Sequence, residues 1–222
     1  MDGDGAAPGT VAERAADSGG LSRQRILRTA VEFIDREGLP ALTMRRLGGV
    51  LGVEAMALYH HLPNRDALVT AIADRVLEPL GVLESSHDWR EACSSVAHTV
   101  RDIAVRRPAT FRLIGLQPFD SKPALRSVER LLAILVSAGF DPADALAVYR
   151  AVSSYARGYA LAEATGFTVD AAAPEGRRRL RALRPDDFPI LRARTPDLVR
   201  LKPDAGFEFG LTALIRGIAE GA

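Results

Sequence analysis

Residues 42–65 read LTMRRLGGVLGVEAMALYHHLPNR, and this stretch decides the fold of the N-terminal part of the chain. Thr43 is a good N-cap, because its hydroxyl can accept a hydrogen bond from an otherwise unbonded amide in the first turn of a helix. Gly52 stands where a residue without Cβ can take the left-handed conformation that ends a helix. Pro63 then stops the next helix early. The stretch therefore predicts two short helices joined by a tight turn.

The two predicted helices cover residues 44–51 and 54–61, and such a pair is typical of a DNA-binding helix-turn-helix. In the second helix Leu58 and Leu62 share one face, which leaves small, apolar and aromatic side chains on the outside. Residues 21–65 contain seven Lys or Arg and four acids, a net charge of +3, whereas the whole chain carries only +1. Basic charge concentrated on the motif favours a polyanionic partner over the alternative, an ordinary helical hairpin with amphipathic surface groups.

The block from Ser22 to Leu80 contains RILRTAVEFIDREGLPALTMRRLGGVLGVEAMALYHHLPNRDALVTAIADRVL and resembles the N-terminal domain of the tetracycline-repressor (TetR) family of bacterial transcription regulators. The threonine cap, the leucine and glycine turn, the aromatic LYHH and the NRDAL start of the fourth helix all have counterparts in that family. The resemblance implies an all-helical homodimer that binds palindromic operators and releases them when a small molecule enters the C-terminal domain.

Carried over position by position, the resemblance implies a set of DNA contacts. Thr43 is then the helix cap near a phosphate, and Arg45 contacts a base or a phosphate. Tyr59 and His61 contact backbone phosphates from the second helix of the motif. Arg65, at the start of the following helix, takes the place of a basic phosphate contact.

The residues that face base edges by the same resemblance depart from the tetracycline repressor, which has polar or proline side chains there. Alanine and methionine at residues 55–57 cannot make bidentate hydrogen bonds to guanine or adenine, but they can pack against a thymine methyl, so we expect a different operator. His60 is either a DNA contact or half-buried filler. With the basic Arg46, the candidate DNA-binding residues are Thr43, Arg45, Arg46, Ala55, Met56, Ala57, Tyr59, His60, His61 and Arg65.

The composition is that of a globular protein with a sizeable core in one or two domains: 222 residues, 47% hydrophobic, 26% charged, mean hydropathy +0.02. No run is long and apolar enough for a membrane span, and the N-terminus lacks the pattern of a signal peptide, so we expect a cytoplasmic protein with no membrane partner. The single cysteine, Cys93, lies in an apolar stripe and is expected to be a small core residue.

The whole chain is predicted to be all-α, with a helix-turn-helix DNA-binding domain followed by a helical bundle that binds ligand and dimerises. No strand pattern and no internal repeat are present. We expect a disordered tail over residues 1–21, the DNA-binding domain over 22–65, a connecting helix over 66–80, and the ligand-binding and dimerisation domain over 81–222. Within the last domain, helices are predicted over residues 89–106, 109–114, 122–137, 142–165, a short one over 186–192, and 205–221.

Two of the predicted helices, 142–165 and 205–221, carry stripes of small residues. Glycine costs about 1 kcal/mol relative to alanine inside a helix, so several in one helix suggest a close contact that compensates. That contact is either packing within one subunit or a two-fold interface between the same helices of a homodimer, which the resemblance also implies. The stripes are Ala147, Ala151, Ser154, Gly158 and Ala162, and then Gly206, Gly210, Ala213 and Gly217.

An effector site is expected among the helices between residues 89 and 165, where apolar walls carry a few polar groups. Each polar group could equally be ordinary surface or satisfied core. By resemblance, Leu113 or Ile114 replaces a magnesium-binding histidine, and Val96 and Val100 replace polar drug contacts, so a magnesium–tetracycline effector is not expected. The candidates for an unknown small-molecule effector are His98, Arg101, Gln117, Tyr149, Tyr155 and Arg157.

Residues 177–202 form a strongly basic segment, with nine basic residues and three acids, a net charge of +6. Such a segment with prolines is either a solvated connection or the lining of a pocket mouth for an anionic effector. The four histidines show no metal-ligand spacing, and no metal or cofactor is predicted.

We expect a sequence-specific transcriptional regulator, most simply a ligand-released homodimeric repressor of a palindromic operator. The alternative within DNA binding is a constitutive or architectural protein without an effector. Glycine-rich phosphate loops, Gly-x-Ser-x-Gly elbows and His-Glu-x-x-His pairs are missing from the sequence, so an enzyme is not expected.

Overall fold

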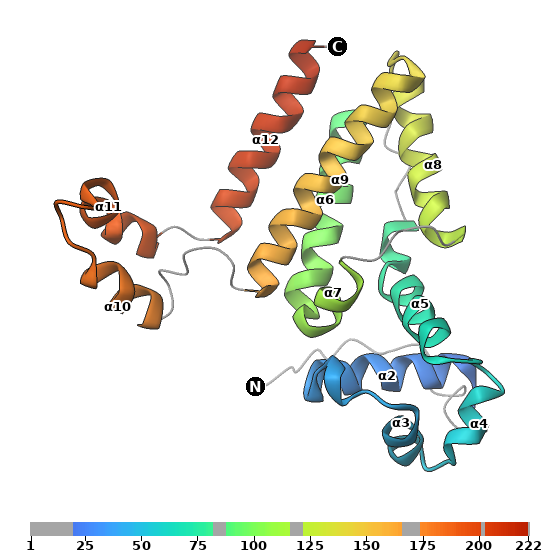
Figure 1. Ribbon diagram of the computed structural model, residues 1–222. Helices are drawn as coiled ribbons and strands as arrows, with labels where there is room; N and C mark the ends of the chain where they lie inside the picture. Colours follow the sequence, from blue (N-terminus) through green and yellow to red (C-terminus); the bar gives the residue numbers. More distant parts are fainter. Residues whose placement is uncertain (1–19, 82–87, 116–121, 166–173, 201–202, 222) are drawn as a thin grey trace, which may run out of the picture. The chain divides into compact units, whose positions relative to one another are not determined.

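The computed structural model describes residues 20–81, 88–115, 122–165, 174–200 and 203–221 (Figure 1). Throughout these ranges the regular structure is helical, without any strand, which confirms the predicted all-α class. Within the same ranges, no helix has the length and apolar character needed to cross a membrane. The tail predicted over residues 1–21 lies almost wholly outside the described residues.

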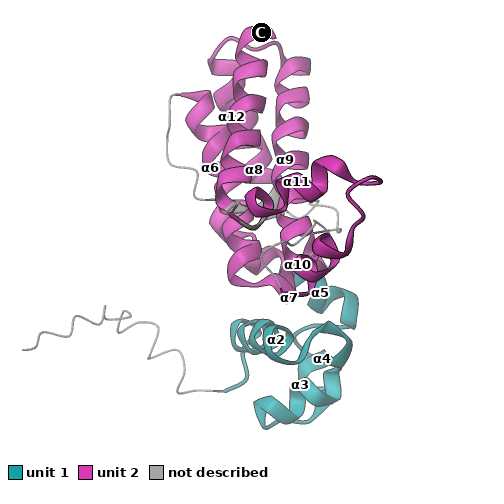
Figure 2. Cartoon of the chain, turned by 90° about the vertical axis from the view of Figure 1, so that its left-hand side faces the viewer, with its two compact units in different colours: residues 1–72 teal, residues 73–222 magenta. Residues whose placement is uncertain are grey.

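Two compact units divide the chain inside a helix, after Ile72 (Figure 2). Unit 1 comprises residues 1–72 and unit 2 comprises residues 73–222. Helix α5, Arg65–Val76, therefore contributes to both units and joins them covalently.

Unit 1 is built around a small interior of aliphatic side chains. Its helices are α2 (Arg23–Glu37), α3 (Met44–Leu51), α4 (Ala55–Tyr59) and the first part of α5, with the 3-10 turn η1 (Leu39–Ala41) between α2 and α3. The amide of Arg25 donates to Ser22 Oγ at 3.2 Å, which caps α2. Burial of each large apolar side chain contributes about 1.5–3 kcal/mol. The fully buried set is Ile26, Ala30, Ile34, Leu47, Leu58, Leu62 and Ile72, with Phe33 and Leu68 nearly so.

Two helices of this part end earlier than predicted. Helix α4 stops at Tyr59, because the amides of His61 and Leu62 both donate to the carbonyl of Leu58 and tighten the chain into a turn before the proline. Helix α5 stops at Val76, and a 3-10 turn, η2 (Glu78–Gly81), replaces its predicted last turn.

In unit 2, α9 (Pro142–Thr165) lies at the centre and packs against α6, α7, α8 and α12. The surrounding helices are α6 (Trp89–Arg106), α7 (Pro108–Ile114), α8 (Lys122–Ser137) and α12 (Pro203–Gly221), close to their predicted ranges. Ala145, Ala156 and Ala160 of α9 are buried, and such small side chains let neighbouring helices approach closely. Cys93 of α6 is fully buried, which confirms its predicted place in the core.

The segment predicted to hold only one short helix, over residues 186–192, contains two: α10 (Pro174–Ala182) and α11 (Pro189–Arg200). The prediction missed one helix and most of the other, because the prolines and charges of this segment favoured an irregular connection. Pro174 and Pro189 instead begin the helices, where the missing amide costs nothing. Helix α11 continues through Pro196. The hydroxyl of Thr195 donates to the Leu191 carbonyl at 2.8 Å in this turn.

Candidate nucleic-acid interface and ligand cavity

Local signals position α3 and α4 as the sequence predicted. The amide of Arg46 donates to Thr43 Oγ1 at 3.2 Å, so Thr43 is the N-cap of α3. Gly52 ends α3 in the left-handed conformation, with φ of 72°. Gly48, which the sequence analysis passed over, is equally important, because a Cβ there would lie 2.8 Å from the carbonyl oxygen of Val53. Only glycine therefore lets α3 pass this close to the turn before α4.

Helix α4 is anchored by its aliphatic face and exposes the opposite one. Leu58 and, just beyond the helix, Leu62 are fully buried, whereas Met56 is 65% exposed and Tyr59 is 40% exposed. Ala55, Ala57 and His61 are half-buried, and His60 is exposed. Val50 of α3, 50% exposed, adds an apolar group that the sequence analysis did not select. The outer surface of the helix pair thus combines methyl groups, an aromatic ring and imidazoles.

The two arginines predicted for this surface, Arg45 and Arg46, differ in how many contacts fix their side chains. Arg45 is exposed, and within the described part of the chain it makes no ion pair or side-chain hydrogen bond. Arg46 donates to the Ala41 carbonyl at 3.3 Å and to Glu37 at 3.5 Å, and its guanidinium lies 5.0 Å from the centre of the Phe33 ring. Arg46 therefore ties α3 to α2, whereas Arg45 makes no such tie to the described residues.

Two further groups frame the C-terminal end of α4. Arg65, exposed, begins α5, and the preceding Asn64 accepts a hydrogen bond from the Ala67 amide at 2.7 Å. Arg23, at the start of α2, donates to the His61 carbonyl at 3.5 Å. The link between Arg23 and the end of α4 joins residues 38 apart in the chain, so helical spacing could not have revealed it.

Unit 2 contains an apolar cavity that is partly open to solvent; the cavity and the adjoining solvent space together measure about 460 Å³. Its walls come from η2, α6, α8 and α9. Two of the predicted effector residues, Tyr149 and Arg157, line it, together with Val96 and Val100, the two valines for which the sequence analysis expected changed drug contacts. The full lining is Leu80, Val96, Val100, Ser127, Val128, Leu131, Tyr149, Ser153 and Arg157.

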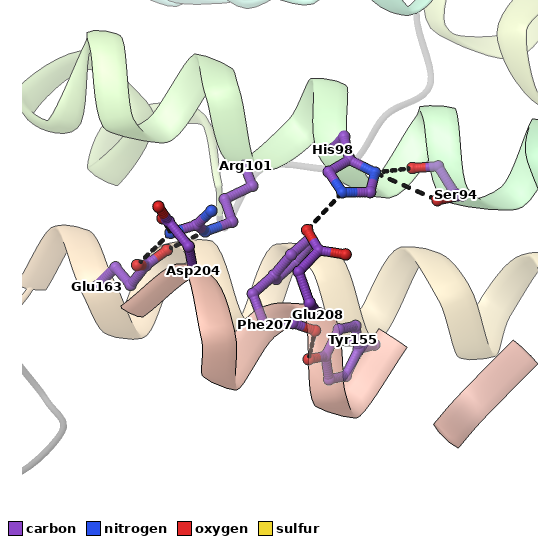
Figure 3. A network of polar contacts seen from close by, with 8 residues as sticks. All are labelled: Ser94, His98, Arg101, Tyr155, Glu163, Asp204, Phe207 and Glu208. Atoms are coloured by element: carbon purple, nitrogen blue, oxygen red, sulfur yellow. Dashed lines mark hydrogen bonds and ion pairs between the residues drawn. The ribbon is translucent and has the colours of Figure 1, made fainter. Parts of the chain in front are cut away.

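Three other predicted effector residues are not part of this lining. His98, Arg101 and Tyr155 instead belong to a polar network that joins α6 and α9 to α12 (Figure 3). Gln117, the sixth candidate, lies outside the described residues. The polar groups that the sequence analysis assigned to one pocket therefore belong to two separate places.

Arg101 is the centre of the network and is only 9% exposed. Its Nε and Nη2 atoms donate to the two carboxylate oxygens of Glu163 at 2.7 and 2.9 Å, and Nη2 also donates to Asp204 at 2.6 Å. Its guanidinium lies 5.0 Å from the centre of the Phe207 ring. The hydrogen bond with Glu163 is the main reason that the pKa of Arg101 is raised.

His98 forms the second link to α12. Its Nδ1 lies 2.7 Å from the Ser94 carbonyl oxygen and its Nε2 lies 2.6 Å from Glu208 Oε1, so both ring nitrogens face acceptors. Partial burial opposes protonation, but the hydrogen bonds to Glu208 and Ser94 outweigh it and raise the pKa of His98.

The small-residue stripes divide between packing within the subunit and open surface. A Cβ on Gly206 would lie 2.5 Å from Tyr159 Oη, and one on Gly210 would lie 2.8 Å from the Tyr155 ring. These two glycines therefore serve packing within one subunit. Gly158 and Gly217 have no such neighbour within 4 Å among the described residues and remain open.

Several arginines of the basic segment pair with nearby acids. Arg178 and Arg179 contact Glu175 at 2.9 and 3.7 Å, and Arg194 contacts Asp197 at 3.3 Å. No described residue of 177–202 lines the cavity. In the part of the chain that the structure covers, no group of three His, Cys, Asp or Glu residues could hold a metal ion.

Comparison with known proteins agrees with both units. Residues 26–72 match the model of bacterial regulatory proteins of the tetR family, and residues 83–221 match the tetracyclin repressor-like C-terminal domain. The chain is 31% identical over 207 residues to an HTH-type transcriptional regulator of Saccharopolyspora erythraea, with 90% of this chain and 85% of the relative covered. It is 30% identical over 205 residues to the class A tetracycline repressor protein from transposon 1721 of Escherichia coli, with 90% and 91% covered.

Solved structures extend the likeness to the whole fold. The Streptomyces coelicolor TetR family protein ActR, in complex with (S)-DNPA, superposes with a TM-score of 0.75 at 29% identity, over 91% of this chain and 98% of that chain. Both halves of the chain match the family models, and the helix pair of unit 1 has the exposed surface that DNA binding requires. The chain therefore belongs to the tetR family of bacterial regulatory proteins and is a DNA-binding transcriptional regulator.

Proposed function

We propose that this regulator is a homodimeric repressor that binds a palindromic operator and releases it when a small molecule enters the cavity of unit 2. The observation that carries the proposal is the place of that cavity in the chain. Leu80 lines it, and Leu80 lies only four residues after α5, the helix that begins in unit 1 at Arg65. A ligand that shifts η2 therefore acts on the element that leads directly to the DNA-binding helices.

For DNA, we propose that α4 enters the major groove. Met56, with its flanking alanines, then packs against base edges, and Tyr59 and His61 contact phosphates, with Arg45 and Arg65 on either side. The exposure of Met56 and Tyr59 beside fully buried Leu58 supports this orientation. We assign Arg46 a positioning role, because Glu37 and the Ala41 carbonyl already hold its guanidinium.

For the dimer, we propose that the open faces of α9 and α12 meet those of a second copy. Ala147, Ser154 and Gly158 of α9 are exposed, as are Ala213 and Gly217 of α12. Phe209 of α12 is 79% exposed, an apolar surface of the kind that interfaces cover. Two reading helices related by the two-fold axis then match the two halves of a palindrome.

DNA binding is tested on a duplex selected from random sequence by the pure protein, with affinity measured by fluorescence anisotropy. Arg45→Ala and Tyr59→Ala are each expected to weaken binding by about 1–3 kcal/mol. Arg106→Ala, an exposed arginine of α6, is the matched control and is expected to leave the affinity unchanged. Failure to select any duplex, or equal affinity of all three variants, contradicts the proposal.

The dimer is tested by sedimentation. Gly158→Arg places a long charged side chain on the open face of α9 without crowding its own subunit, so we expect it to yield monomers that bind the selected duplex weakly. Ala133→Arg, on the exposed face of α8, is the control. If Gly158→Arg sediments like the unmodified protein, the proposed interface is wrong.

The effector is tested by thermal shift against a small-molecule library, because a ligand that favours the folded state must raise its stability. Compounds that raise Tm are then added to the protein–DNA complex, and release of the duplex is expected. The alternative, a constitutive or architectural DNA-binding protein, predicts that no stabilising compound changes DNA affinity.

A further inference from the structure

Helix α12 is held to α6 by two ion pairs of different kinds. Arg101 of α6 binds Asp204 of α12 and also Glu163 of α9, and a guanidinium keeps its charge at every pH that a cell meets. The second pair joins His98 of α6 to Glu208 of α12, with Nε2 lying 2.6 Å from Oε1 (Figure 3). The ordinary pKa of histidine lies near neutral pH, so of these two pairs only the second can be broken by a small change of pH.

The contacts of the His98 ring fit its protonated form. Its Nδ1 lies 2.7 Å from the Ser94 carbonyl oxygen, while Nε2 faces the Glu208 carboxylate. A neutral imidazole has one N–H and can donate to only one of these acceptors, whereas the imidazolium donates to both. The hydroxyl oxygen of Ser94 lies farther from Nδ1, at 3.3 Å, so the carbonyl oxygen is the closer neighbour. The geometry therefore favours a positive charge on His98, and the raised pKa of this residue agrees with it.

The other charged and titratable groups of the network do not cancel this preference. On α6, Asp102 adds a second negative charge that favours the imidazolium, and two carboxylates neutralise the positive charge of Arg101. From α9 the network contains Glu163, which binds Arg101, and two tyrosines. Burial raises the pKa of Tyr155 and of Tyr159, so both stay uncharged near neutral pH. His98 is therefore the group of this network that titrates there.

Glu208 lies next in the chain to the apolar surface that we propose for the dimer. The following residue, Phe209, is 79% exposed. When His98 loses its proton, the half-exposed carboxylate of Glu208 loses its positive partner, and covering that carboxylate with a second copy becomes more costly. One of the two ion pairs that fix the first turns of α12 is lost as well. Both effects weaken the dimer as pH rises.

We propose that a proton on His98 fastens α12 to α6 and thereby strengthens the homodimer, so that assembly of this regulator responds to pH. This inference rests on the proposed dimer through α12 and adds its control by protons. The link is complete below the ordinary histidine pKa of 6.5 and is lost as pH rises through the raised value. A two-fold dimer contains the link twice, so the effect of one link on assembly is multiplied by that of the other.

The test measures subunit dissociation of the full-length protein at pH 6 and at pH 8, at one ionic strength. Chains labelled at the N-terminus with donor or acceptor dyes are mixed, and energy transfer between them gives the dissociation rate. An exposed ion pair accounts for roughly a threefold change, so two copies should make dissociation about tenfold faster at pH 8. His98→Gln and Glu208→Gln are each expected to remove most of this difference between the two pH values.

Glu220→Gln is the matched control, because it breaks an exposed ion pair of the same helix, with Arg216 at 3.6 Å, that does not depend on a histidine. It is expected to keep the tenfold difference. A proton NMR titration of the His98 ring should show a lower pKa in Glu208→Gln and an unchanged one in Glu220→Gln. An undiminished pH effect in Glu208→Gln overturns the inference. The comparison of the two glutamate variants stays decisive even if His98→Gln fails to fold.

Sedimentation at the same two pH values separates this inference from the proposed dimer. A protein that is monomeric at both pH values contradicts the proposed homodimer and overturns the inference with it. A dimer that dissociates at the same rate at pH 6 and pH 8 overturns only the inference and leaves the proposed homodimer standing.

Discussion

The two carboxylates that bind Arg101 are predicted to differ strongly in their contribution to stability. Asp204 makes the shorter contact, at 2.6 Å, but its side chain is 77% exposed. Glu163 makes two contacts, at 2.7 and 2.9 Å, and its side chain is only 18% exposed. Water screens the first pair and competes for it, whereas the second pair is largely removed from water. The burial of each carboxylate, and not its distance from Arg101, should therefore decide how much each ion pair contributes to the free energy of unfolding.

Breaking a buried ion pair by removing one partner costs about 3–5 kcal/mol, because the remaining charge stays buried. Glu163→Gln keeps the shape and one acceptor oxygen, so we place its cost at the lower end, about 3 kcal/mol. Asp204→Asn removes an exposed charge and should cost less than about 1 kcal/mol. With a urea m-value of about 2 kcal/mol/M, the first change lowers the unfolding midpoint by about 1.5 M and the second by less than about 0.5 M.

The measurement is urea unfolding followed by circular dichroism, with all variants at one protein concentration because the stability of the proposed dimer would depend on concentration. In an Arg101→Met background, Glu163→Gln should lower the free energy of unfolding much less, because the positive charge that Glu163 neutralises is no longer present. Equal costs for the changes at Glu163 and Asp204, or an undiminished cost in the Arg101→Met background, refute the reasoning.

Other predictions follow from single contacts. Gly48→Ala should lower both the Tm and the DNA affinity, because its Cβ meets a backbone carbonyl at 2.8 Å, whereas Gly49→Ala, with open space around it, should raise stability by up to about 1 kcal/mol in thermal unfolding. The raised pKa of His98 adds stability that is complete below its ordinary value of 6.5 and is lost as pH rises through the raised value, so His98→Asn should flatten the fall of Tm with pH in that window. Burial raises the pKa of Cys93 to about 12, so a thiol reagent at pH 8 should label it only after unfolding in urea.

The sequence predicted the helix-turn-helix well because its signals are local. Thr43 caps a helix within three residues of itself, and Gly52 turns the chain at its own position, so neither depends on distant parts of the fold. The crowding at Gly48 arises because the chain returns past this residue after the turn, which brings the Val53 carbonyl close to it. Two adjacent glycines in a sequence do not reveal which of them will be crowded in this way. The same reasoning explains why the bond from Arg23 to the end of α4 was not foreseen.

The division of the effector candidates shows what periodicity leaves undetermined. A helix turns by about 100° per residue, so on α6 the pair Val96 and Val100 and the pair His98 and Arg101 lie on opposite sides. The valines line the cavity, and the other two residues bind α12. The sequence analysis placed His98 and Arg101 in a pocket because they are polar. Which face of α6 meets the cavity and which meets α12 depends on how the neighbouring helices pack, and polarity does not reveal that.

Helix α9 repeats this arrangement with a third side. Tyr149, Ser153 and Arg157 cover one arc of the helix, Tyr155 and Glu163 cover another that faces α6 and α12, and the exposed Ser154 and Gly158 cover the arc between them. All three stripes have spacings of four residues or multiples close to it, so the sequence offers three equivalent faces. The rotation of α9 about its axis is fixed by its packing against α6, and that rotation assigns one face to the cavity, one to α12 and one to the open surface. Helices α6 and α9 form part of the cavity wall and also make the contacts that hold α12. A ligand that moved either helix would therefore shift the contacts to α12 as well.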